Sequence, residues 1–167
     1  MKKISQLLFF IAIIVWATLV GAIVYSHMVF FSAYLTHLPA STALLKGDYG
    51  LHDEKFWMMI HPVLIIALVL TLLLNWKLAE RRKYILIAMG IYAAAIISTF
   101  LYFVPELKNF AASDQSTISA ADWLERGNRW QYLSWTRGVF MFIGFILLLI
   151  GLTKNEKVIR VADHPGP

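Results

Sequence analysis

Long apolar runs separated by shorter polar stretches dominate the chain. A helix needs about 20 residues, at a rise of about 1.5 Å each, to cross the hydrocarbon core of a bilayer. Four runs meet or approach this length, namely Leu7–Tyr25, Phe56–Trp76, Tyr84–Val104 and Gly138–Leu152, the last flanked by Trp135. The pattern predicts an all-α integral membrane protein with four transmembrane helices.

The connections between these runs differ in length. Only the polar turn Lys77–Lys83 separates the second run from the third, and short turns favour antiparallel neighbours, so an up-down-up-down four-helix bundle is expected. The longer segment Ser26–Lys55 is expected to begin as a continuation of the first helix. In the other long connection, Ser119 or Asp122 is expected to cap a short extracytoplasmic helix that reaches Trp130.

The composition supports a lipid environment. Of the 167 residues, 59% are hydrophobic and 15% are charged, and the mean hydropathy is +0.66, as in integral membrane proteins. The opening Met1-Lys2-Lys3 is similar to a secretory signal, but the apolar run reaches Tyr25 without a small-x-small cleavage site, which favours a retained first helix. Residues 1–160 are expected to form one four-span domain and residues 161–167 a disordered cytoplasmic tail.

The basic residues favour a plasma-membrane protein with both termini in the cytoplasm. The formal net charge is +5, but the basic residues are split among loops, so nucleic acid is not an expected partner. The turn between the second and third runs holds the decisive basic cluster under the positive-inside rule, which consists of Lys77, Arg81, Arg82 and Lys83. The two long connections then face outward.

The sequence contains no cysteine. This excludes disulfides, thiolate-held clusters, covalent c-type haem attachment and a cysteine nucleophile. Any bound metal would need histidine, carboxylate or other oxygen and nitrogen ligands.

Every predicted span contributes a polar group near the outer surface. His27 lies at the outer end of the first span, His61 shortly inside the second, Tyr102 and Glu106 at the close of the third, and Arg137 at the start of the fourth. Ionisable residues inside a membrane are costly unless paired, which makes them candidate functional residues. Their shared depth predicts a polar pocket that opens outward.

Each of these residues also has a structural interpretation. In this interpretation His61 packs the bundle through a hydrogen bond to a neighbouring helix. His27 is then simply hydrated at the membrane interface. Arg137 is able to snorkel toward lipid phosphates. Tyr102 and the tryptophans fit the aromatic belt at the membrane surface.

Two kinds of chemistry suit two histidines at one depth. The imidazoles of His27 and His61 are candidate axial ligands of haem b or, with a carboxylate such as Glu106 or Asp122, ligands of a non-haem metal. Without a cofactor, a neutral histidine is a candidate general base on an acidic C–H or O–H of a lipophilic substrate, and Arg137 a candidate for stabilising the anion. The histidine spacing leaves both alternatives open.

Several short motifs, spread over nearly the whole chain, resemble those of one family. They are the Gly21-bearing first helix, the His61-Pro62 pair, the stretch Pro105-Glu106-Leu107-Lys108, and Trp130 followed by Arg137 and an apolar helix with Gly144. In these features the sequence is similar to the anthrone-oxygenase-like family of small four-helix membrane proteins. The resemblance implies that fold and, as in members with an assigned role, oxidation of a polycyclic aromatic anthrone to a quinone with O₂.

The resemblance also implies functional roles for His61, Trp130 and Arg137. The family often has a histidine or an asparagine four residues after the tryptophan, where this chain has Ser134. The asparagine expected soon after the proline near the third span is displaced to Asn109. These departures concern the polar partners of the site rather than the fold.

The leading hypothesis is an outward-facing site inside the bundle that acts on a small hydrophobic or aromatic molecule in an oxygenase-like reaction. The candidate catalytic residues are His61, Arg137 and His27, and the candidate substrate-binding residues are Phe31, Tyr102, Glu106 and Trp130. One alternative is a membrane subunit for electron transfer or sensing that binds haem b or a metal through His27 and His61. The other is a non-enzymatic subunit that docks a membrane partner through residues 122–135. Association into a homo-oligomer is a separate expectation.

Overall fold

A computed structural model describes residues 2–37, 40–45, 48, 50–112 and 119–154 of the chain. All regular elements of these residues are helical. The longest are α1 (Lys2–Tyr25), α3 (Glu54–Leu74), α4 (Ala79–Ser98) and α6 (Ala120–Thr153), and each belongs to a helix long and apolar enough to cross a membrane. The prediction of an all-helical protein with four helices long and apolar enough to span a membrane is confirmed for the described residues.

Two of the long helices continue through wide, π-helical turns. α1 passes through a π-helix at Ser26–Phe31 into α2 (Ser32–Thr36), and α4 passes through a π-helix at Thr99–Phe103 into α5 (Val104–Ala112). Such turns hold an extra residue relative to an α-helical turn and often mark functional sites. A 3₁₀-helix, Ala40–Leu45, follows α2. The expected helical continuation of the first span is thereby confirmed.

The helix expected to begin at Ser119 is continuous with the fourth span. Ser119 caps α6, because its Oγ accepts a hydrogen bond from the backbone N–H of Asp122 at 3.1 Å. From this cap the helix runs over 34 residues to Thr153. No proline interrupts this stretch, so the helix propagates from the polar segment into the apolar span. The predicted cap is confirmed, and the predicted separate short helix is instead the first part of α6.

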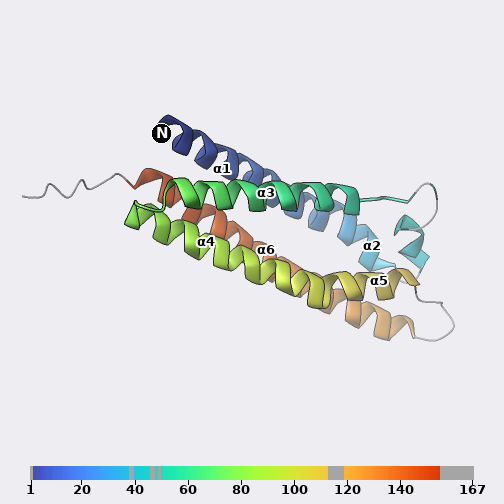
Figure 1. Cartoon of the computed structure of the whole chain (residues 1–167). Coiled ribbons are helices and arrows are strands. Elements are labelled where there is room, and N and C mark those ends of the chain that lie inside the picture. The colour runs from blue at the N-terminus through green and yellow to red at the C-terminus, as the bar shows by residue number, and fades with distance from the viewer. Residues whose placement is uncertain (1, 38–39, 46–47, 49, 113–118, 155–167) are drawn as a thin grey trace, which may run out of the picture.

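The four long helices lie side by side (Figure 1). The start of α1, the turn between α3 and α4 and the end of α6 lie at one end of the bundle, whereas α2, α5 and the start of α6 lie at the other, here called the α2/α5 end. α4 packs along α6, and α1 packs on α3 and α6, but α3 and α4 share few contacts. The bundle is therefore most open between α3 and α4.

Large side chains fill the middle of the bundle. Trp16, Leu64, Tyr92 and Leu148 are buried, and each comes from a different long helix. A Cβ atom on Gly144 would lie 2.7 Å from Cζ2 of Trp16. The glycine therefore admits the indole ring against α6, as small residues do between membrane helices.

A polar cluster ties the helices together at the end remote from α2 and α5. The buried Asn75 follows α3 and accepts hydrogen bonds through Oδ1 from Ser5 of α1 at 3.0 Å and from Arg81 of α4 at 3.3 Å. Arg81 also donates to the carbonyl groups of Leu152 and Lys154 at the end of α6. These bonds link all four long helices and satisfy carbonyl groups that a helix end leaves free.

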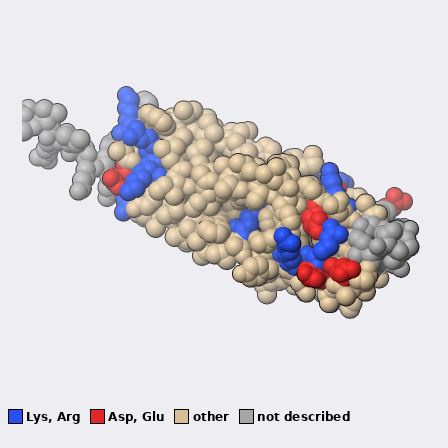
Figure 2. All heavy atoms as spheres, turned by 90° about the horizontal axis from the view of Figure 1, so that it is seen from below, with Lys and Arg blue, Asp and Glu red and all other residues tan. Residues whose placement is uncertain are grey.

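Most charged side chains on this face gather toward the two ends of the bundle, although basic atoms are also visible nearer its middle (Figure 2). A long, largely uncharged band lies between them, as expected for a surface in contact with lipid. Together with the four apolar helices, this distribution fits a multi-pass membrane protein. The tail predicted to be disordered, residues 161–167, lies outside the described residues.

Candidate functional site

His27 lies in the π-helical turn that follows α1 and is 3% exposed. Its Nδ1 lies 2.8 Å from the carbonyl oxygen of Ile23, which can only accept, so Nδ1 carries a proton and donates. Its Nε2 lies 2.8 Å from Oγ of Ser134 on α6. In the neutral ring Nε2 can only accept, so the Ser134 hydroxyl donates to it. These two bonds fix both the position and the tautomer of the neutral imidazole.

Arg137 joins α6 to the helix that contains α4. Its Nη1 donates to Oγ1 of Thr99 at 2.6 Å and its Nη2 donates to Oγ of Ser134 at 3.1 Å. The guanidinium carbon lies 4.0 Å from the centre of the Phe103 ring. Within the described residues, no acidic side chain forms an ion pair with Arg137. A half-buried cation without an acidic partner is costly among apolar helices, so this position favours a negatively charged or strongly polar ligand.

His61 forms a second polar pair, with Tyr92, across α3 and α4. Its Nδ1 lies 2.7 Å from the Tyr92 hydroxyl oxygen, and that hydroxyl donates to the His61 carbonyl at 3.5 Å. The two contacts agree when Nδ1–H donates to Tyr92 and the phenol proton points to the carbonyl. Nε2 of His61 makes no hydrogen bond to another described residue. It is therefore available to a ligand.

The two imidazoles are held by different helices. His27 is bonded to α6 and His61 to α4, and no direct contact joins the two rings. Ser134 joins His27 to Arg137 through one hydrogen bond to each. The structure thus brings His27 and Arg137 together and places His61 in a second pair with Tyr92, while the catalytic roles of all three residues stay a prediction.

A row of side chains leads from Asp53, the residue before α3, to His61. Asp53, Trp57 and His61 follow one another at the four-residue spacing that places side chains on one face of a helix. The indole N–H of Trp57 donates to Asp53 at 2.9 Å, and the Trp57 ring stacks on the His61 ring with centroids 6.0 Å apart. Through this hydrogen bond Asp53 holds the indole that stacks on one side of His61. Burial raises the pKa of the Asp53 carboxyl.

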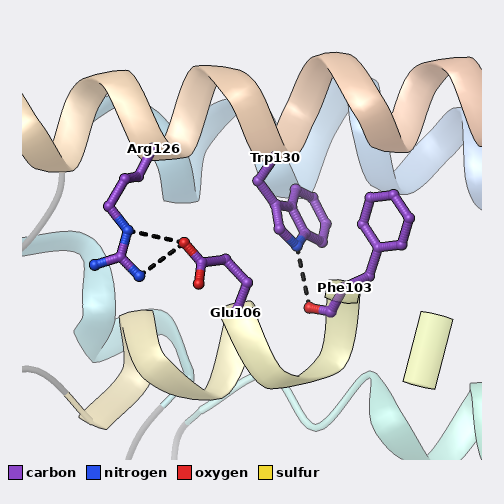
Figure 3. A network of polar contacts seen from close by, with 4 residues as sticks. All are labelled: Phe103, Glu106, Arg126 and Trp130. Carbon is purple, nitrogen blue, oxygen red and sulfur yellow. Dashed lines mark hydrogen bonds and ion pairs between the residues drawn. The ribbon is translucent and has the colours of Figure 1, made fainter. Parts of the chain in front are cut away.

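Aromatic rings enclose His27. The ring centre of Trp135 lies 4.7 Å from that of His27, the ring of Phe31 lies at 5.5 Å and the ring of Trp130 at 6.4 Å. Trp130 packs on Phe31 at 4.6 Å and donates its indole N–H to the carbonyl of Phe103 at 3.1 Å (Figure 3). Of the predicted substrate-binding residues, Phe31 and Trp130 therefore lie beside His27.

Glu106 and Tyr102, the other predicted substrate-binding residues, have different neighbours. Glu106 of α5 forms an ion pair with Arg126 of α6, with Oε1 2.7 Å from Nη2 (Figure 3). Tyr102 packs edge-on against Phe103 with ring centres 5.1 Å apart. The ion pair gives Glu106 a structural task, because it ties α5 to α6. Substrate binding by Glu106 or Tyr102 stays a prediction.

The haem or metal alternative gains no support from the described residues. They contain no group of three or more histidine, cysteine, aspartate or glutamate side chains placed to hold a metal ion. Both ring nitrogens of His27 are already hydrogen-bonded within the protein, whereas a ligating histidine gives one nitrogen to the metal. Glu106, a candidate further ligand, is paired with Arg126.

Three residues of this group, Tyr92, Thr99 and Ser134, are not among the predicted site residues. Tyr92 carried a signal, since a tyrosine in the middle of an apolar span needs a partner for its hydroxyl. Ser134 carried one too, because it lies three residues before Arg137 and hence on the same helix face. Thr99 carried none, because a helical threonine commonly bonds its own backbone, as Thr99 does with Ala95 at 2.7 Å.

Comparison with known proteins supports the resemblance drawn from the motifs. The model of the anthrone oxygenase family matches residues 53–147. This part runs from the residue before α3 into α6, so it contains His61, Tyr92, Ser134 and Arg137 but not His27. No curated protein and no solved structure matches the chain. Because the matched residues make up more than half of the 167, the chain belongs to the anthrone oxygenase family.

Proposed function

We propose that this protein is a membrane-embedded oxidoreductase that uses O₂ to convert a small hydrophobic aromatic molecule of the anthrone type into a quinone. Membership of the family supports the type of reaction. Polar side chains inside the bundle support the location of the reaction. The imidazole of His61 has a free nitrogen, and the guanidinium of Arg137 has no acidic partner among the described residues.

The setting of Arg137 is the observation that carries the proposal. Thr99 and Ser134 hold its guanidinium at two nitrogens, and Phe103 covers one face. A fixed donor with little surrounding water stabilises charge that develops on a substrate oxygen more strongly than water does. An anthrone that loses a C–H proton places its negative charge largely on the carbonyl oxygen. Arg137 is therefore assigned to this oxygen.

His61 is the base in this proposal. With Nδ1–H donating to Tyr92, the lone pair of Nε2 accepts the proton from the substrate carbon. The carbanion then gives its electrons to O₂, one oxygen atom becomes the new carbonyl oxygen, and the other leaves as water with the two hydrogens of the carbon. The balance, R₂CH₂ + O₂ → R₂C=O + H₂O, needs no further reductant. His27 orients Ser134, and through it Arg137.

The proposal places the α2/α5 end outside the cell, in an up-down-up-down bundle of the plasma membrane with both termini in the cytoplasm. Supporting this orientation, the opposite end holds the turn between α3 and α4 (Figure 1). That turn carries the basic cluster of the chain, Lys77–Lys83, and such clusters favour the cytoplasmic side.

Oxidation of anthrone by the purified protein in lipid nanodiscs tests the function, with O₂ uptake and anthraquinone formation as readouts. His61→Ala is expected to lower kcat/KM by about 100-fold or more, and Arg137→Gln by about 100-fold. His52→Ala is the matched control, because this exposed histidine pairs with Glu54 away from the site. Thermal unfolding checks that each variant is folded.

The outcomes separate the site from the substrate. If the wild-type protein oxidises anthrone and both site variants do so at an unchanged kcat/KM, the assigned residues are wrong. If the wild-type protein leaves anthrone untouched, the substrate class is wrong. Loss of folded protein in His61→Ala would instead favour the structural interpretation of that histidine.

A further inference from the structure

The hydroxyl of Tyr92 is the hydrogen-bond partner of the His61 ring. It lies 2.7 Å from Nδ1 of His61 and donates to the carbonyl oxygen of the same residue at 3.5 Å. The Tyr92 side chain is 4% exposed, and the Trp16 ring packs edge-on against it with ring centres 5.6 Å apart. The hydroxyl therefore meets His61 from a position that packing holds in place.

The two histidines of the bundle obtain partners for Nδ1 in different ways. Nδ1 of His27 bonds to the carbonyl of Ile23, four residues earlier in its own helical segment. Among the described residues, Nδ1 of His61 hydrogen-bonds to Tyr92 of α4 and to no carbonyl of its own helix. The proton on Nδ1 is thus held by the local backbone in His27, but by a side chain of another helix in His61.

We infer that Tyr92 is a positioning residue, which sets the tautomer of His61 and leaves the lone pair of the neutral ring on Nε2. The inference rests on the proposed function, in which Nε2 takes the substrate proton, and deepens it by naming the residue that prepares this base. The hydrogen bond of one histidine nitrogen decides which nitrogen carries the proton. In serine proteases the wrong tautomer alone lowers kcat by about 10⁴-fold.

The hydrogen-bonding capacity of the pair favours this tautomer. The phenol oxygen of Tyr92 can accept from Nδ1–H while its own proton points to the His61 carbonyl. In the opposite tautomer Tyr92 would donate to Nδ1, and the proton on Nε2 would find no acceptor among the described residues. An unpaired donor inside a protein is unfavourable. Protonation at Nδ1 therefore uses every donor of the pair.

Trp57 holds the same imidazole in a different way and provides a matched control. Its ring stacks on the face of His61 with centres 6.0 Å apart, and its indole N–H is used by Asp53. A change at Trp57 therefore disturbs the packing of His61 but keeps the partner of Nδ1. Tyr92→Phe does the reverse, because the ring remains and only the hydroxyl is lost.

Solid-state nitrogen NMR of the ¹⁵N-histidine-labelled protein in phosphatidylcholine bilayers reads the tautomer, because protonated and bare ring nitrogens differ widely in chemical shift. At a pH where the rings are neutral, His61 of the wild type is expected to carry its proton on Nδ1. Tyr92→Phe is expected to move this proton to Nε2 or to give a mixture, whereas Trp57→Phe is expected to keep it on Nδ1. His27, whose partners are unchanged, is the internal control, and His61→Ala identifies the His61 signals by their absence.

Turnover of anthrone is the second readout. Tyr92→Phe is expected to lower kcat by about tenfold or more and to keep KM within about twofold, because a wrongly protonated base impairs proton transfer rather than binding. Tyr84→Phe is the control for activity. It removes a phenol hydroxyl nearer the start of α4, where the ring lies beside Lys154, so an unchanged kcat is expected.

The two readouts keep this inference apart from the proposed function. A wild-type His61 protonated on Nε2, or a folded Tyr92→Phe that keeps the proton on Nδ1, would overturn the inference even if the protein oxidises anthrone. The wild-type spectrum needs no variant, so it tests the tautomer even if Tyr92→Phe does not fold. A tautomer that Tyr92→Phe changes and Trp57→Phe keeps supports the inference. If kcat is then unchanged, the assignment of Tyr92 to the tautomer holds and the base role of His61 is wrong.

Discussion

Nε2 of His27 and Oγ of Ser134 lie 2.8 Å apart, although 107 residues separate them in the chain. This contact joins the first transmembrane helix to the last. The same hydroxyl oxygen accepts a hydrogen bond from Arg137, which also reaches Thr99. One small side chain thus contacts both the imidazole of His27 and the guanidinium of Arg137, which the proposed reaction assigns to the substrate oxygen.

Ser134→Ala is expected to destabilise the protein by about 1–3 kcal/mol, because it leaves buried groups of His27 and Arg137 unpaired. It is also expected to lower kcat/KM for anthrone, since Arg137 loses one of its two fixed partners. Thermal unfolding and O₂ uptake measure the two effects. Thr136→Ala is the control, because this exposed hydroxyl bonds only within its own helix, to Tyr132. Equal behaviour of the two variants would contradict the role given to Ser134.

Gly144→Ala is expected to destabilise the bundle by about 1–3 kcal/mol through overpacking. Its new Cβ would lie 2.7 Å from Cζ2 of the fully buried Trp16, which has little room to move. In contrast, a Cβ on Gly21 or Gly90 would meet no atom within 4 Å. Thermal unfolding in detergent should therefore rank Gly144→Ala well below Gly21→Ala and Gly90→Ala. Similar midpoints for the three variants would argue against this packing.

Glu106→Gln is expected to lower stability by about 1–3 kcal/mol and to change kcat/KM by less than about twofold, because its partner is Arg126. A double-mutant cycle with Arg126→Gln should show that most of the stability loss is shared by the pair. A raised KM for anthrone with unchanged stability would instead assign Glu106 to substrate binding.

The pKa of Asp53 gives a prediction for pH. Burial raises it above the ordinary value of 3.8, so the folded state holds this proton more tightly than the unfolded state. This contribution to stability therefore grows as the pH falls through the folded pKa toward 3.8, and it is absent at higher pH. Relative to Asp53→Asn, the wild-type protein should gain thermal stability as the pH falls from neutral toward 3.8. Parallel profiles of the two proteins would exclude a raised pKa.

The four spans could be predicted because hydropathy reports directly on the lipid that surrounds each helix. The common depth of His27, His61 and Arg137 stays a prediction, which rests on their positions along the spans. The hydropathy pattern could not show how each helix is rotated about its axis, which decides the residues that face the other helices. In a membrane both the packed and the lipid-facing sides are apolar, as the buried Leu64 between the exposed Val63 and Ile65 illustrates. The contact of His61 with Tyr92 and that of Arg137 with Ser134 depend on this rotation.

The two π-helical turns set the direction of every side chain that follows them. One extra residue in a helix rotates the residues beyond it by about 100°. Phe30, Phe31 and Tyr34 are buried beyond or at the end of the first turn, and Phe110 beyond the second. Deleting one residue from Ser26–Phe31 would therefore leave the chain able to span a membrane but rotate Tyr34 out of the buried aromatic cluster. Insertion into the bilayer and assembly of this cluster are thus separable properties of the chain.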